Sequence, residues 1–119
     1  MLKKGNGWRI GWREDAEIYK GLIGADDWAI ELTEAEIKDF CRLLEQLADN
    51  LEKMQDYLMD EEKISCEVES ELIWLSAEGY ADNYSLRVIV LQNRSCEGNW
   101  ASLAVPELIN ATKSLIFAK

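Results

Sequence analysis

The feature that most constrains the fold is a long stretch with a helical repeat of apolar residues, from Thr33 to about Met59. These residues recur mostly three or four positions apart, which aligns them along one side of a helix. The stripe consists of Ile37, Phe40, Cys41, Leu44, Leu47, Ala48, Leu51, Met54 and Leu58. Thr33 and Glu36 have the spacing of a capping box at the helix start. A helix of this length, roughly 40 Å, would cross the whole domain, so we expect the other elements to cover its apolar side.

Alternation of apolar and polar residues predicts short strands on both sides of this helix. Three strands are expected before it, at residues 8–13, 19–23 and 28–32. After it we expect a long strand at 64–74, a turn at 76–83, and strands at 84–92 and 100–103. In this register Trp74 faces Tyr84, Glu71 faces Arg87 and Val68 faces Val90. Pro106 fits the start of a short closing helix, whose apolar side carries Leu108, Ile109, Thr112, Leu115 and Ile116.

Three strands and a helix, repeated twice, predict a single α+β domain over residues 1–119 with antiparallel sheet in a βββα-βββα arrangement. A weak internal echo accompanies this order. Trp28-Ala29 and Ile37 recur as Trp100-Ala101 and Ile109, at an offset of 72 residues. Both duplication and coincidence remain open as explanations of these three identities.

The net charge of −10 is unevenly distributed along the chain. Residues 1–20 hold five basic and three acidic residues, whereas residues 26–71 hold sixteen acidic and four basic ones. Such a field repels polyanions and disfavours nucleic-acid binding. No apolar run is long enough to span a membrane, and no signal peptide is recognisable. The three cysteines lack metal-ligand spacing, their odd number leaves at least one thiol free, and Cys41 and Cys66 have the positions of core residues. We therefore expect a reducing, cytoplasmic location.

The chain contains no histidine and none of the common nucleophile, phosphate-loop or dinucleotide motifs. We therefore expect no enzyme activity, no cofactor and no metal site. The favoured interpretation is a non-catalytic protein-interaction module. The alternatives are a single-stranded nucleic-acid-binding protein, which would use exposed tryptophans as stacking platforms, and a small-molecule or cation-binding protein. Most of the five tryptophans share a phase with aliphatic neighbours, which favours a core role.

Three groups of residues are candidate surface sites. An anion or acidic-partner patch would use Arg9, Arg13 and Lys20. A cation or basic-partner patch would use Asp56, Asp60, Glu61 and Glu62. Apolar residues on the second face of the central hairpin predict a homodimer interface, formed by Ile73, Leu75, Ile89 and Leu91.

Five segments resemble a family of small uncharacterised cyanobacterial proteins, a domain of unknown function. They are residues 7–13, 19–22, 28–36 and 58–62, and Arg94 with 97–100. The resemblance implies a stand-alone cytoplasmic protein without known activity, and it supplies no catalytic residues. That family is similar in fold to the Whirly-type single-stranded-DNA-binding regulators, which build a curved antiparallel sheet with packed helices. The expected order is one strand short per half, and Glu67, Glu69 and Glu71 stand where that fold needs positive charge.

Overall fold

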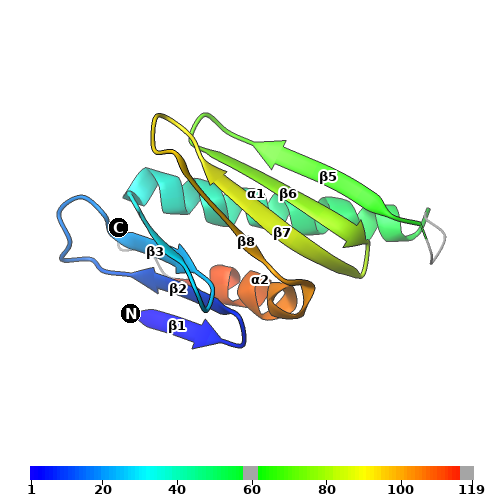
Figure 1. Ribbon diagram of the computed structural model, residues 1–119, viewed down its shortest axis with the longest axis horizontal. Coiled ribbons are helices and arrows are strands. Elements are labelled where there is room, and N and C mark those ends of the chain that lie inside the picture. Colours follow the sequence, from blue (N-terminus) through cyan, green and yellow to red (C-terminus); the bar gives the residue numbers. More distant parts are fainter. Residues whose placement is uncertain (58–61, 116–119) are drawn as a thin grey trace.

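The computed structural model describes residues 1–57 and 62–115 as an α+β fold with two four-stranded antiparallel sheets and two α-helices (Figure 1). The first sheet has the order β1-β2-β3-β4 and the second the order β5-β6-β7-β8. The first half consists of β1 (Leu2–Gly5), β2 (Trp8–Trp12), β3 (Gly21–Gly24), β4 (Ala29–Leu32) and α1 (Glu34–Gln55). The second consists of β5 (Ile64–Glu69), β6 (Ile73–Tyr80), β7 (Asn83–Val90), β8 (Cys96–Trp100), the 3-10 turn η1 (Ser102–Ala104) and α2 (Val105–Lys113).

The start of α1 is as expected from the sequence. Thr33 Oγ1 accepts a hydrogen bond from the Glu36 amide at 3.2 Å, and Glu36 Oε1 accepts one from the Thr33 amide at 2.8 Å. These two bonds satisfy amides that the first helical turn leaves unpaired. The helix ends at Gln55, earlier than the expected end at about Met59, and Leu58 and Met59 lie outside the described residues.

The apolar stripe of α1 forms the centre of the core. Five of its predicted members are at most 1% exposed, namely Ile37, Phe40, Leu44, Leu47 and Leu51. The helix contacts β5 and β6 of the second sheet, β3 and β4 of the first, and α2. The shorter α2 contacts β2 and β7 and buries Leu108. Both helices therefore pack against side chains that point to the inner faces of the sheets.

Strand β1 of the first sheet was not predicted from the sequence. Residues Leu2–Gly5 pair with β2, in the register Leu2 to Gly11 and Gly5 to Trp8. The strand holds one apolar residue among two lysines and a glycine, so it has no detectable alternation. The sequence sign of this strand was the Asn6-Gly7 pair, which is typical of a tight turn between two strands. Gly7 has a φ of +80°, a conformation that residues with a side chain rarely adopt.

The strands of the second sheet differ from the prediction. The expected long strand is two strands, because the chain reverses at Ser70, whose Oγ accepts from the Leu72 and Ile73 amides at 3.1 and 3.2 Å. Consequently, Val68 faces Leu75 and Trp74 faces Ile89, so the predicted register is wrong. Most of the turn expected at 76–83 is strand, and the last strand precedes the segment 100–103 where it was expected.

Candidate interaction site

The two faces of the first sheet carry different side chains. On the inner face, Ile10, Ile23 and Leu32 are fully buried beneath the helices. On the outer face, one row runs across all four strands through Leu2, Gly11, Leu22 and Glu31. The helices α1 and α2 contact the same strands from the opposite, inner face. Because Gly11 has no side chain, the row is interrupted in its middle.

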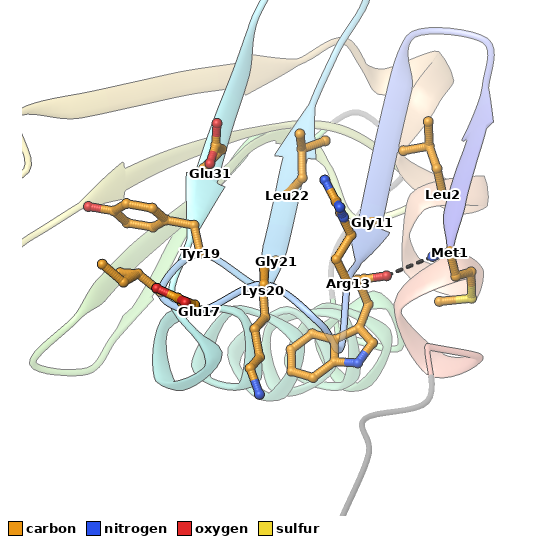
Figure 2. A pocket seen from close by; sticks show the side chains of 13 residues that line it. Met1, Leu2, Gly11, Arg13, Glu17, Tyr19, Lys20, Gly21, Leu22 and Glu31 are labelled. Carbon is orange, nitrogen blue, oxygen red and sulfur yellow. Dashed lines mark hydrogen bonds between the residues drawn. The ribbon is translucent and has the colours of Figure 1, made fainter.

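A hollow of about 490 Å³ lies over the outer face and at the adjoining end of the sheet, where the segment 13–20 crosses (Figure 2). Its lining is mainly apolar and includes Trp12, Ile18, Tyr19 and Leu22. We call this feature the apolar hollow; its complete lining is Met1, Leu2, Gly11, Trp12, Arg13, Ala16, Glu17, Ile18, Tyr19, Lys20, Gly21, Leu22 and Glu31. A hollow of a few hundred cubic ångströms with a mainly apolar lining is typical of a binding site.

Exposed apolar side chains gather around the apolar hollow. Among the described residues, six large hydrophobic side chains are exposed, and four of them line the apolar hollow. Their exposed fractions are 51% for Met1, 60% for Leu2, 63% for Ile18 and 41% for Tyr19. Single exposed hydrophobic residues are common on protein surfaces, but a cluster of them around a concavity indicates an interaction site.

Charged groups of both signs surround the apolar hollow. Arg13 and Lys20 line it together with Glu17 and Glu31. The Arg13 side chain is 74% exposed and lies 3.6 Å from the carboxylate of Asp15. Lys20 Nζ lies 3.7 Å from the carboxylates of both Glu14 and Glu34. A hydrogen bond from Lys38, its charge, and the charge of Lys20 lower the pKa of Glu34. The basic groups are thus paired with acids of this chain.

Arg94 attaches the wall of the apolar hollow to the second half of the chain. Its guanidinium carbon lies 4.8 Å from the centre of the Tyr19 ring, and an Nη2 hydrogen bond goes to the Glu31 carbonyl oxygen. Nε lies 3.6 Å from Oε2 of Glu36, a carboxylate whose side chain is 6% exposed. Arg94 therefore joins Tyr19, β4 and the first turn of α1. The same Glu36 side chain also completes the capping box.

The loop that presents Arg94 has an unusual backbone. Three non-glycine residues, Gln92, Asn93 and Ser95, have positive φ angles of 63, 66 and 53°. Such conformations cost free energy unless surrounding contacts stabilise them. Here the Gln92 side chain donates to the Glu71 carbonyl oxygen at 3.1 Å, and Arg94 makes the contacts described above. The loop conformation and the position of Arg94 thus depend on each other.

The predicted anion patch is only partly assembled. Arg13 and Lys20 line the same hollow, but Arg9 does not. Arg9 instead donates to the carbonyl oxygens of Ala25 and Trp28, both at 2.9 Å, and closes the β3–β4 turn. Its role in this structure is to hold that turn.

The predicted interface on the central hairpin is wrong for two of its four residues. Ile73 and Leu75 are fully buried on the inner face of β6. Ile89 lies on the outer face, opposite Trp74, and Leu91 follows the end of β7; both are half-buried. The reversal at Ser70 explains the error, because it changes which residues of β6 point inward. The four residues therefore do not form one surface.

The outer face of the second sheet is polar and closed. Arg87 lies over the Trp74 ring at 5.9 Å and pairs with the Glu97 carboxylate at 3.0 Å. Glu67 and Glu69 are exposed on the neighbouring strand β5. The half-buried Trp74 is thus covered by a charged side chain.

The remaining sequence-based sites have separate outcomes. Asp56 is the exposed C-cap of α1 and Glu62 is exposed, whereas Asp60 and Glu61 lie outside the described residues. Within residues 1–57 and 62–115, no three potential metal ligands cluster.

Trp8, Trp12 and Trp100 are buried in the core, and Trp28 packs against Trp100 with ring centres 5.0 Å apart. None of the helices in these two ranges is long and apolar enough to cross a membrane.

The cysteines occur as free thiols rather than disulfides. Burial raises the pKa of Cys41 to about 12, so its reactive thiolate form is scarce near neutral pH. Cys66 and Cys96 pack at the edge of the core. All three cysteine side chains therefore pack against the hydrophobic core.

Sequence reasoning missed the apolar residues of this site, namely Met1, Leu2, Ile18, Tyr19 and Leu22, and also Gly11. Ile18 lies between the polar segment 14–17 and the predicted strand 19–23, to which Tyr19 was assigned. Two adjacent apolar residues at the end of an otherwise charged segment were the available signal. Gly11 interrupts an alternating strand, which is a sign of close approach or missing side-chain volume.

Comparison with known proteins places the chain in a family. A solved structure, described as the crystal structure of a protein with unknown function from DUF155 family from Prochlorococcus sp. NATL2A, superposes with a TM-score of 0.90. The two chains are 30% identical, over 96% of this chain and 97% of the other. No curated protein matches. Residues 3–115 match the family model of a domain of unknown function, DUF1818. The chain therefore belongs to the DUF1818 family.

Proposed function

We propose that the protein is a non-catalytic interaction module that binds a protein partner through the apolar hollow of the first sheet. The observation that carries this proposal is the convergence of Met1, Leu2, Ile18 and Tyr19, four of the six exposed large hydrophobic side chains of the described residues, on one concavity. Water around these side chains is released when an apolar group of the partner covers them, and this release favours association.

The chemistry of the hollow supports binding rather than catalysis. Its lining contains no serine, threonine, cysteine or histidine. Arg13 and Lys20 are held in ion pairs with acids of this chain, and Glu17 is exposed. The free thiols accord with action in a reducing compartment, and we place the protein in the cytoplasm on that basis.

Quantitative co-purification from the native cell tests this function. Tagged wild-type protein should retain a partner that Ile18→Ser loses, because the substitution removes a 63% exposed apolar side chain from the hollow. Leu103→Ser is the matched control, since Leu103 is 80% exposed and lies on η1, away from the hollow. Equal loss in both variants, or retention of all partners in Ile18→Ser, would contradict the proposal.

A second candidate is single-stranded nucleic-acid binding on a Whirly-like fold. Four strands followed by a helix occur in each half, which supplies the strand per half that the sequence analysis lacked. This order favours the likeness in fold. The surface charge does not favour nucleic-acid binding, because Glu67 and Glu69 are exposed on β5 and Glu71 is exposed in the following turn, where they would repel phosphates.

A further inference from the structure

We infer that the partner contacts the first sheet with an extended acidic segment, which pairs with the free edge of β1 as a fifth strand. This inference rests on the proposed function and names the chemistry of the partner. Strand β1 is the outermost strand of its sheet, and its other side has no neighbouring strand among the described residues (Figure 1). An extended peptide can bind such an edge through its backbone, as an added strand.

The backbone of β1 offers hydrogen-bonding groups at this edge. Met1 and Trp12 exchange two backbone hydrogen bonds, with N–O distances of 2.7 and 2.8 Å. In an antiparallel pair, residues that exchange such bonds alternate with residues whose N–H and C=O groups point away from the partner strand. The backbone groups of Leu2 and Lys4 therefore point to the free edge, where they can pair with an added strand.

The other three sheet edges are less suitable for an acidic segment. At the edge of β4, the Glu31 carbonyl oxygen accepts a hydrogen bond from Arg94. At the edge of β8, the Asn99 carbonyl oxygen accepts one from the Trp28 indole at 3.0 Å. Each of these two edges is thus partly closed by a side chain of the other half. Strand β5 forms the fourth edge and carries two exposed glutamates, which repel acidic groups.

The charge of β1 selects the kind of partner. Among the described residues, neither Lys3 nor Lys4 lies in an ion pair, in contrast to Arg13 and Lys20 of the apolar hollow. Lys3 Nζ donates to the Ser114 hydroxyl at 2.6 Å, and Lys4 is exposed. These lysines attract carboxylates of a partner, and they oppose pairing with the β1 edge of another copy.

The side chains of β1 also set the order of residues in the segment. Leu2 and Lys4 lie on the outer face of the sheet, Leu2 at the apolar hollow, and Lys3 lies between them on the inner face. An apolar residue fits beside Leu2, and acidic residues fit beside Lys3 and Lys4. A Cβ placed on Gly5 would lie 2.6 Å from the Glu107 carboxylate, so a third acidic residue does not fit at that end.

A synthetic peptide with the central order valine, glutamate, glutamate, valine, flanked by threonines and labelled with fluorescein, tests the inference. Because this order is the same in both directions, the peptide can add to β1 in a parallel or an antiparallel sense. In fluorescence anisotropy at about 50 mM salt, the full wild-type chain should bind it with a Kd below about 500 µM. The same peptide with lysines in place of the glutamates should not bind.

Variants separate the charge of β1 from its backbone pairing. Lys4→Glu should raise the Kd at least about tenfold, because it turns attraction into repulsion. Lys53→Glu changes the net charge equally, on an exposed residue in the last turn of α1, and should change the Kd by less than about twofold. Leu2→Pro removes an N–H at the free edge and no β1–β2 bond, so it should weaken binding more than Leu2→Ala does. Far-ultraviolet circular dichroism of each variant confirms that it is folded.

Each other outcome overturns the inference. Equal affinity for the lysine peptide, or equal loss in Lys4→Glu and Lys53→Glu, would show that β1 does not select the peptide. Equal affinity for a peptide with two consecutive N-methylated residues would exclude strand pairing, because one of two neighbouring residues always faces β1. Absence of binding by the wild type would exclude the acidic segment. If Ile18→Ser then still loses a captured partner that Leu103→Ser keeps, the proposed function stands without it.

Discussion

The two halves of the molecule share an element order but differ at their outer sheet faces. In the first sheet, the apolar side chains of Leu2, Ile18 and Tyr19 stay exposed around the apolar hollow. In the second sheet, the corresponding strand carries Trp74, which Arg87 covers at 5.9 Å while pairing with Glu97. One face therefore offers an apolar cavity, and the other closes over its aromatic residue with charge.

This difference shows how one architecture can give unlike surfaces. The inner faces are constrained by α1 and must be apolar in both halves. The outer faces carry no such constraint, so single positions decide their character. Uncovered apolar side chains line the hollow on one face, and an arginine lies over the aromatic residue on the other. Four predictions test which properties the two halves share, such as their core, and which differ, such as their outer faces.

The largest effect is expected in the core that the two halves share. Leu44→Ala should lower the free energy of unfolding by about 2–5 kcal/mol, because it removes buried methyl groups and leaves a cavity in α1's contact with the sheets. Urea denaturation measures the change. Leu103→Ala, on an 80% exposed side chain, is the control and should stay within about 0.5 kcal/mol of the wild type. Similar values for both variants would contradict the assigned core.

A smaller effect is expected where Arg94 joins the halves. Arg94→Met should lower the free energy of unfolding by about 1–3 kcal/mol, because it leaves the buried Glu36 carboxylate without its charged neighbour. Arg87→Met is the matched control, since Arg87 is 53% exposed in its ion pair and should change stability by less than about 1 kcal/mol. Urea denaturation of both variants, at equal salt, compares them. Equal losses would show that Arg94 is no stronger a link than a surface ion pair.

The capping box of α1 should contribute less than the leucine core. Thr33→Ala should lower the free energy of unfolding by about 1 kcal/mol, because the Glu36 amide loses its hydrogen-bond acceptor. The same urea experiment gives the value. A loss larger than that of Leu44→Ala would mean that the helix depends on its cap more than on contacts with the two sheets.

The smallest effect is expected from single-stranded oligonucleotides. We expect no binding at micromolar protein concentrations and physiological salt, because the outer face of the second sheet exposes Glu67 and Glu69 to the phosphates. Fluorescence anisotropy of labelled oligonucleotides measures binding. A Kd in the micromolar range or below that rises steeply with salt would favour the nucleic-acid alternative and remove the functional contrast between the two faces.

Several elements of the fold could be predicted because their signals are local. The capping box and stripe of α1 depend on residues within one or two helical turns, and both are confirmed. The inward phase of β2 was equally clear, since Trp8, Ile10 and Trp12 alternate with polar or small residues. Strand β6 was ambiguous, because Leu72 and Trp74 are as apolar as Ile73 and Leu75. Alternation alone cannot choose between two apolar phases.

By itself, the sequence determined the α+β class, the position and apolar side of the long helix, and the absence of histidine chemistry. Tertiary structure decided which face of β6 is buried, because the Ser70 reversal resets its phase. It also decided that Arg94, from a loop in the second half, contacts Tyr19 and Glu36 in the first. The apolar hollow was also decided by tertiary structure, since its walls come from segments that only strand pairing brings together. The periodicity of a sequence does not show which apolar side chains remain uncovered.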